Sequence, residues 1–212
     1  MPKPPVREAL TLNGPVGLLE AVLEVPAEAD PVGAAVVLHP HPQHGGTMHN
    51  KVAHTLARAC LHAGFAALRF NFRGTEASEG EFDHGNGERD DALAALEWMR
   101  GRYHKLPLWL TGFSFGAAMA VKAAIEHPVD GLVSVAPAIS RFADGLPSQP
   151  QCPWLVVQGD EDELVDLDET LAWFNGLEPG PELRVMQGVE HFFHGRLVEL
   201  RDAVTDFILR DR

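Results

Sequence analysis

Residues 108–120 have the sequence LWLTGFSFGAAMA, in which an apolar run, a serine with a glycine two residues away on each side and a string of small residues follow one another. Residues 108–112 are apolar enough for a strand that is covered on both faces. The small residues at the end of the stretch favour a helix. Gly112 and Gly116 permit a tight turn between the two, because glycine adopts backbone conformations that strain other residues. The stretch therefore predicts a strand, a sharp turn and a helix, with Ser114 at the turn.

A G-x-S-x-G pattern between a strand and a helix is typical of the nucleophile elbow, a strained turn that raises a serine hydroxyl above the sheet. Ser114 would lie at the helix N-terminus, so the backbone N–H of Phe115 is aimed to stabilise a developing oxyanion. The alternatives are an ordinary strand-to-helix turn and a nucleotide-binding loop. The glycine spacing matches neither G-x-G-x-x-G nor G-x-x-x-x-G-K-[ST], and no lysine follows. The pattern thus favours a nucleophilic serine.

Short apolar runs alternate with longer segments of helical period on both sides of this stretch. Such alternation is typical of parallel strands joined by crossover helices. No repeat or linker divides the chain, and its length suits a single domain that covers residues 1–212. We therefore expect an α/β fold: a three-layer sandwich with a mostly parallel sheet and helices on both faces. The expected strands are residues 18–25, 34–39, 66–70, 108–112, 132–135, 155–158 and 183–186, and the expected helices are residues 51–62, 88–102, 117–126, 168–177 and 197–209.

Serine is a weak nucleophile until a base removes its proton, so the elbow predicts a histidine and an orienting carboxylate elsewhere in the chain. Both residue types follow later expected strands. The acids Asp160 and Asp162 lie in one such stretch, and His191 follows the last strand. Because the carboxyl ends of parallel strands meet at one edge of a sheet, we expect these side chains to lie near Ser114.

The chain resembles the α/β-hydrolase superfamily and, within it, the small lidless serine hydrolases related to dienelactone hydrolase. The resemblance rests on the chain order serine, acid, histidine and on five stretches spread over nearly the whole chain. They are HPHPQHGGTMHNK (39–51), LRFNFRGTEASEGEFDHGNGE (68–88), GFSFG (112–116), VVQGDEDELVD (156–166) and GVEHFFHGRL (188–197). In similar families the acid lies three residues after the glycine that ends the strand. The resemblance therefore implies Asp162 as the catalytic acid, while Asp160 would brace the turn by a hydrogen bond to the backbone.

The loop HPHPQHGG, residues 39–46, supplies the second oxyanion donor in the α/β-hydrolase interpretation. Its two prolines, Pro40 and Pro42, have no N–H to donate. The backbone N–H of His41 is therefore the expected donor, with Gln43 behind it.

The histidines of this loop also support a rival interpretation. H-x-H-x-x-H after a strand resembles the zinc-binding loop of metallo-β-lactamase-type hydrolases, and imidazole is a common zinc ligand. In that pattern an aspartate precedes the third histidine, whereas Gln43 stands there in this chain. A metal-dependent hydrolase built on His39, His41 and His44 is thus the alternative, and the preferred interpretation has no metal site.

Three side chains near the expected site are candidates for substrate binding: Gln43, His44 and Arg73. For His39 and His44, a structural hydrogen bond and a substrate contact both remain open. Arg73, in the loop after the expected strand 66–70, is expected to anchor that loop rather than act as a catalyst. The acidic segment that follows, residues 76–91, is expected to be a solvated loop leading into a helix near the mouth of the site.

Composition narrows the choice of partners. The 17 Lys and Arg residues against 30 Asp and Glu give a formal net charge of −13, which argues against a nucleic-acid partner held through phosphates. Cys60 and Cys152 have no metal-like spacing and suggest reduced thiols in a cytoplasmic protein. Neither a signal peptide nor a membrane-spanning run is found in the sequence. We expect a cytoplasmic monomer or homodimer that acts on a small-molecule ester, with no nucleic-acid or membrane partner.

These features together predict a serine hydrolase that cleaves a small carboxylic ester or thioester through an acyl-enzyme, without a cofactor. Ser114 would attack, His191 would move the proton and Asp162 would orient the imidazole. Only residues 136–152 separate the expected strand 132–135 from the next one, so no lid domain is expected and the cleft should be open. Besides the metal-dependent hydrolase, the other alternative is a non-catalytic α/β-hydrolase scaffold that binds a ligand or partner.

Overall fold

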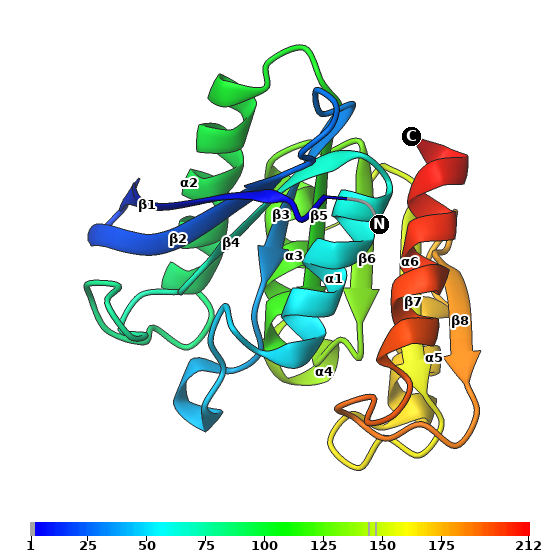
Figure 1. Ribbon diagram of the computed structural model, residues 1–212. Coiled ribbons are helices and arrows are strands. Elements are labelled where there is room, and N and C mark those ends of the chain that lie inside the picture. Colours follow the sequence, from blue (N-terminus) through cyan, green and yellow to red (C-terminus); the bar gives the residue numbers. More distant parts are fainter. Residues whose placement is uncertain (1–2, 144, 147) are drawn as a thin grey trace.

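An eight-stranded sheet runs through the centre of the protein in the order β1-β2-β4-β3-β5-β6-β7-β8 (Figure 1). The computed structural model describes residues 3–143, 145–146 and 148–212. β1 and β2 form an antiparallel hairpin, β2 pairs antiparallel with β4, and every other pair is parallel. The strands are β1 (Val6–Gly14), β2 (Gly17–Val25), β3 (Gly33–Leu38), β4 (Phe65–Phe70), β5 (Leu108–Phe113), β6 (Gly131–Val135), β7 (Trp154–Gly159) and β8 (Glu182–Met186).

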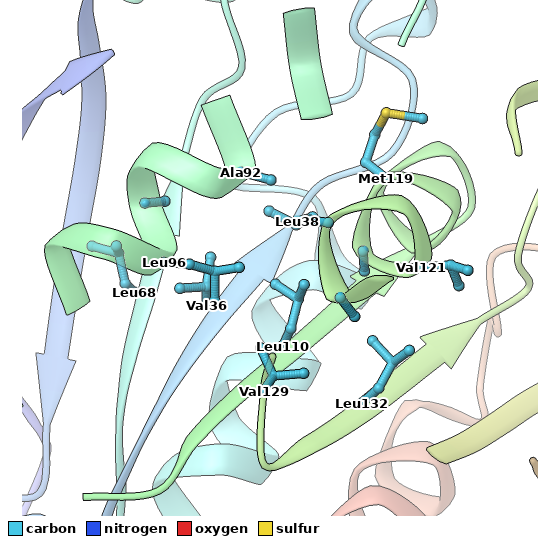
Figure 2. Close-up of a cluster of buried hydrophobic side chains, with 14 of the residues drawn as sticks. Val36, Leu38, Leu68, Ala92, Leu96, Leu110, Met119, Val121, Val129 and Leu132 are labelled. Carbon is cyan, nitrogen blue, oxygen red and sulfur yellow. The ribbon is translucent and has the colours of Figure 1, made fainter. Parts of the chain in front are cut away.

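Helices cover both faces of this sheet, because alternate residues of each parallel strand are apolar on opposite sides. α1 and α6 contact each other on one face, where they cover Val37 and Trp109. α2 and α3 lie on the other face, and Figure 2 shows their side chains above Val36 and Leu110. The helices are α1 (Lys51–His62), α2 (Gly87–Arg102), α3 (Phe115–Glu126), α4 (Ile139–Phe142), α5 (Leu167–Phe174) and α6 (Leu197–Asp211), with one 3-10 turn, η1 (Pro42–His44).

The predicted fold class is confirmed, and each expected strand and helix is present to within a few residues at its ends. β1, η1 and α4 were not predicted. β1 is an edge strand in which only Leu12 is buried, so residues 1–17 carry no apolar run that would reveal it. α4 is a single turn of four residues. Among the described residues between β6 and β7, α4 is the only helix, in agreement with the expected absence of a lid.

Two further expectations concern membranes and thiols. No helix in the part of the chain that the structure describes is long and apolar enough to cross a membrane. Cys60 and Cys152 are both free.

The carboxyl ends of the parallel strands meet along one edge of the sheet. In Figure 1 the arrowheads of β3, β6 and β8 point to the lower edge, where the loops that follow these strands gather. The residues singled out from the sequence lie in these loops. Their arrangement therefore depends on the parallel register of β3, β5, β6 and β7.

Candidate active site

Ser114 occupies a strained turn between β5 and α3. Its backbone has φ 55° and ψ −114°, a left-handed φ that L-residues rarely adopt. Glycines make the turn possible: a Cβ atom on Gly112 would lie 2.3 Å from the Gly116 carbonyl oxygen, and one on Gly116 would lie 2.4 Å from the His39 carbonyl oxygen. The Ser114 N–H donates to the Val135 carbonyl at 2.8 Å. The chain thus holds the serine on the elbow that its sequence predicts.

His191 brings Ser114 and Asp162 into one chain of hydrogen bonds. Its Nδ1 lies 2.8 Å from Oδ2 and 3.0 Å from Oδ1 of Asp162, and its Nε2 lies 3.1 Å from the Ser114 Oγ. A carboxylate only accepts hydrogen bonds, so Nδ1 carries the proton and Nε2 is left to accept the serine hydroxyl. Both the histidine and the aspartate side chains are almost completely buried. The arrangement can remove a proton from Ser114.

Asp162 is held by its own turn as well as by His191. Its Oδ1 accepts the N–H groups of Leu164 at 2.9 Å and Val165 at 2.8 Å. Burial alone would raise the pKa of Asp162, but the hydrogen bonds from His191 and from these two backbone groups outweigh it and lower the pKa. The carboxylate therefore stays charged at neutral pH.

Asp160, the other acid candidate, has a different hydrogen-bond partner. Its Oδ1 accepts the Gly188 N–H at 2.7 Å, which ties the loop after β7 to the loop after β8. Asp160 thus makes a side-chain to backbone hydrogen bond as expected, but to a second loop and not within its own turn. The structure therefore brings Asp162, and not Asp160, to His191.

The two expected oxyanion donors lie on adjoining segments. Phe115 is the first residue of α3, so its N–H has no acceptor within the helix. His41 precedes η1, and no acceptor for its N–H is found in the described part of the chain. The two side chains touch, with ring centroids 5.0 Å apart. The loop after β3 also passes directly against the elbow, since the His39 carbonyl would be the first atom met by a Cβ on Gly116.

His39 has a structural role that the sequence left open. Its Nδ1 lies 2.7 Å from the Pro40 carbonyl, so Nδ1 is the protonated nitrogen, and its Nε2 accepts the Phe72 N–H at 3.0 Å. The ring is fully buried. Burial lowers the pKa of His39 to about 4, with the hydrogen bond to Pro40 acting in the opposite direction. His39 thus ties the loop after β3 to the loop after β4 as a neutral side chain.

The hydrogen bonds of His39 also argue against the alternative of a metal-dependent hydrolase. Both ring nitrogens of His39 are already used within the protein, so His39 has no lone pair to offer a metal. Within the described ranges, no group of three or more His, Cys, Asp or Glu residues is arranged to hold a metal ion. The H-x-H-x-x-H spacing of residues 39–44 therefore does not bring three imidazoles to one point.

The buried, neutral His39 predicts a loss of stability in acid. Its pKa is about 4 in the folded protein and about 6.5 when unfolded, so between these pH values only the unfolded state takes up the proton. Stability is therefore full above pH 6.5 and falls as the pH decreases, by about 3 kcal/mol at pH 4. Urea unfolding at pH 7 and pH 4 should show that His39→Gln reduces the pH dependence by this amount. Parallel pH dependences for the two proteins would contradict the assignment.

The three expected substrate-binding side chains are placed differently from one another. Arg73 is buried and forms a two-point ion pair with Asp91, with Nη2 to Oδ1 at 2.7 Å and Nε to Oδ2 at 3.0 Å. Its charge is thus engaged in anchoring the loop, and the expected substrate contact is replaced by this structural one. Gln43 and His44 are exposed, and the His44 ring stacks on His41 with centroids 4.4 Å apart. Both residues belong to η1, directly after the expected oxyanion donor His41.

Sequence reasoning missed three residues that adjoin the site. Phe82 and Phe142 lie with their ring centroids 4.9 Å and 5.4 Å from that of His41. Phe82 comes from the acidic segment, which was expected only to be solvated, and Phe142 from α4. Gln158 of β7 donates to Asp162 at 2.9 Å. A polar residue inside an apolar strand was the available signal for Gln158, whereas an isolated phenylalanine carries none.

A small hollow of about 190 Å³ opens beside Asp162. It is bounded by the loop after β7 and by the start of α4, and its lining is mostly polar: Ala138, Ser140, Arg141, Asp162, Glu163, Leu164, Val165, Asp166 and Glu169. Three acidic side chains besides Asp162 therefore face this space, against one arginine.

Comparison with known proteins agrees with this geometry. Residues 31–149, more than half of the chain, match the family described as serine aminopeptidase, S33. The solved structure of XC6422 from Xanthomonas campestris, an α/β serine hydrolase without a lid, is 42% identical and superposes with a TM-score of 0.89, covering 99% of this chain and 96% of that one. An α/β serine hydrolase homologue from Coxiella burnetii is 43% identical, with a TM-score of 0.89 over 94% of this chain and 96% of that one.

A more distant structure shares the fold alone. Dienelactone hydrolase from Anabaena variabilis is 20% identical and has a TM-score of 0.82 over 99% of each chain. The expected resemblance to lidless hydrolases is confirmed by these matches. With the elbow and the parallel sheet, they show that this chain belongs to the α/β-hydrolase superfamily, within the serine hydrolase family described as serine aminopeptidase, S33.

Proposed function

We propose that this protein hydrolyses esters or thioesters of small carboxylic acids through a covalent acyl-enzyme. The observation that carries the proposal is the unbroken chain of hydrogen bonds from Ser114 through His191 to Asp162 at the carboxyl edge of the sheet. A serine, a base and an orienting acid in this order are the minimum that nucleophilic acyl transfer needs.

In the first half of the reaction the Ser114 Oγ attacks the acyl carbonyl carbon while His191 Nε2 takes the hydroxyl proton. Asp162 stabilises the resulting imidazolium through Nδ1 and remains a carboxylate. The carbonyl oxygen becomes an oxyanion, which the N–H groups of Phe115 and His41 would bind. As the tetrahedral intermediate collapses, the bond to the alcohol or thiol breaks and the leaving group takes the proton from His191.

The second half repeats the chemistry with water as the nucleophile. Water attacks the acyl-enzyme carbonyl and gives a proton to His191 Nε2. The bond to Ser114 Oγ then breaks, His191 returns the proton to the serine and the carboxylic acid leaves. Every proton moves between the substrate, water and these two side chains, so the reaction is complete without a cofactor.

The surroundings of Ser114 support a small or exposed acyl group. The described residues between β6 and β7 place only the short helix α4 beside the elbow, so no large lid encloses a long chain. The hollow next to Asp162 is small and polar. Half-buried Phe82 and Phe142 both pack near His41 and give the surroundings of this expected oxyanion donor an aromatic character.

The charges around the site predict a preference for neutral over anionic substrates. Three acids, Glu169 among them, face the hollow beside Asp162 against the single arginine of its lining, and Arg73 is already paired. A negative potential lowers the local concentration of anions. We expect a neutral short-chain ester to have a kcat/KM about tenfold higher than a matched ester with a carboxylate on its acyl group at low salt, the gap closing as salt screens the field.

Glu169→Gln tests this preference, because Glu169 lines the same hollow but its carboxylate accepts from the Ser140 hydroxyl and not from the triad. The variant should narrow the gap without changing the rate on the neutral ester by more than about twofold. A higher kcat/KM for the carboxylated ester would contradict the prediction and would point to exposed His44 as an anion-binding group.

Labelling with a serine-directed fluorophosphonate tests the proposed function directly. The reagent phosphonylates a serine only where a base and an oxyanion site activate it. Peptide mass spectrometry should find the label on Ser114 and on no other serine, and a panel of esters of increasing acyl length should then define the substrate range. An unlabelled, folded protein would support a non-catalytic binding scaffold instead.

A further inference from the structure

Gln158 is a buried polar side chain in the otherwise apolar strand β7, four residues before Asp162. Its Nε2 donates to the Asp162 Oδ2 at 2.9 Å and to the Val165 carbonyl at 3.1 Å. Gln158 therefore contacts both the acid and the turn that carries the acid.

The neighbours of Gln158 determine which end of its amide faces the site. The Asp162 carboxylate and the Val165 carbonyl are both acceptors, so only the NH₂ end can point at them. The Oε1 end is then directed into the protein, where it has no hydrogen-bond partner among the described residues. A buried amide oxygen without a partner destabilises a fold. Stability of β7 alone therefore gives no reason for a glutamine at this position.

Gln158 donates its hydrogen bond to the Asp162 oxygen that lies nearer to the His191 imidazole. Asp162 Oδ2 is also the atom closest to His191 Nδ1, at 2.8 Å. The other oxygen, Oδ1, accepts the backbone N–H groups of Leu164 and Val165. Among the described residues, Gln158 is thus the one side-chain donor other than His191 that reaches this carboxylate.

We propose that Gln158 is a positioning residue that fixes the carboxylate of Asp162 against His191, a role that rests on the proposed function. Its donated hydrogen bond limits rotation of the carboxylate, so that Oδ2 stays in line with the imidazole Nδ1–H. The same bond stabilises the charged form of Asp162, which favours retention of the proton by the imidazolium. Gln158 itself touches neither the substrate nor Ser114 in this role.

Two substitutions of Gln158, by methionine and by glutamate, keep the side-chain volume nearly unchanged and so distinguish a positioning role from a packing role. Gln158→Met keeps the volume and removes the donor. We expect kcat to fall about 10- to 100-fold with KM unchanged within about twofold, because misplacement of a catalytic group lowers the rate of chemistry rather than binding. The variant also removes the unpaired Oε1, so its thermal unfolding temperature should stay within a few degrees of the wild type.

Gln158→Glu should restore the donated hydrogen bond only at low pH, where the introduced carboxyl group is protonated. A protonated Glu side chain can donate to Asp162 Oδ2 as the amide does, whereas an ionised one places a second negative charge against the carboxylate. The ratio of variant to wild-type kcat should therefore rise toward low pH for Gln158→Glu and stay flat for Gln158→Met. If Gln158→Met does not fold, the pH dependence of the kcat ratio for Gln158→Glu is by itself the test of the positioning role. If the role of Gln158 were purely structural, the ratio of variant to wild-type kcat would be lowered equally in both variants and would not change with pH.

Ser134→Ala is the matched control. Ser134 lies in the neighbouring strand β6 and accepts the Trp154 indole N–H at 3.0 Å in the buried core, away from Asp162. Its loss removes a buried hydrogen bond of the sheet, so it should lower the unfolding temperature while leaving kcat within about twofold of the wild type. A drop in kcat equal to that of Gln158→Met would overturn the proposal.

A readout independent of turnover distinguishes this inference from the proposed function. The low-field proton NMR signal of the His191 Nδ1–H, assigned by its loss in His191→Gln, reports the hydrogen bond to Asp162. We expect Gln158→Met to shift or broaden this signal and Ser134→Ala to leave it in place. An unmoved signal together with unchanged kcat would overturn the positioning role. A shifted signal in a protein that no phosphonate labels would retain that role and overturn the hydrolase function.

Discussion

Ser114→Ala is expected to lower kcat for ester hydrolysis by about five orders of magnitude while the protein remains folded. The Ser114 hydroxyl supplies the nucleophile, and no neighbouring hydroxyl shares the Nε2 of His191 in the described structure. Alanine fits the same turn, since the strained backbone is imposed by Gly112 and Gly116 and not by the serine side chain. The substitution therefore removes the chemistry without removing the elbow.

Initial-rate kinetics on a neutral short-chain ester, with circular dichroism and thermal unfolding as checks on the fold, would measure this effect. Phosphonate labelling should disappear in the same variant. Incubation of the wild type with a metal chelator is the control for the rival mechanism, and it should leave the rate unchanged. Retention of more than about a hundredth of the wild-type rate by Ser114→Ala would rule out Ser114 as the nucleophile.

The elements predicted well from the sequence are those whose pattern of residues lies within the element itself or directly beside it. Helix α1 begins and ends where expected, at Lys51 and His62, because an apolar period of three and four residues coincides with Asn50, whose side chain caps the first turn. The elbow was equally clear, since glycine is the only residue that fits at Gly112 and Gly116. β1 escaped prediction because its stability comes from pairing with β2 and not from an apolar run.

Side-chain roles in the site were predictable only where a motif fixes them. The role of His39 stayed open because its partner, the Phe72 N–H, lies 33 residues away along the chain. Arg73 could have met a substrate or an acid, and only the fold shows that Asp91 reaches it first. Gln158 gave a polar signal in an apolar strand, but its direction toward Asp162 follows from the twist and register of β7, which residue types do not encode singly.

The two acids of the turn after β7 offer the sharpest test of the site, because the same isosteric change should lower kcat greatly at Asp162 and hardly at all at Asp160. Asp162 accepts the Nδ1–H of His191. In Asp162→Asn an amide NH₂ turned toward Nδ1 would force the imidazole proton onto Nε2, the nitrogen that must accept the Ser114 hydroxyl proton. The variant also loses the charge that stabilises imidazolium. We expect kcat to fall about 10⁴-fold.

Asp160 accepts a backbone N–H from Gly188 instead. An asparagine oxygen at this position can accept the same N–H without reorienting any catalytic group, so Asp160→Asn should change kcat by less than about threefold and cost about 1 kcal/mol of stability at most. Parallel measurements of kcat/KM on one neutral ester, with urea unfolding of both variants, compare the acids directly. A large loss of activity in Asp160→Asn with a small one in Asp162→Asn would mean that the functional turn is shifted by two residues, and that the hydrogen bond between His191 and Asp162 does not orient the base during turnover.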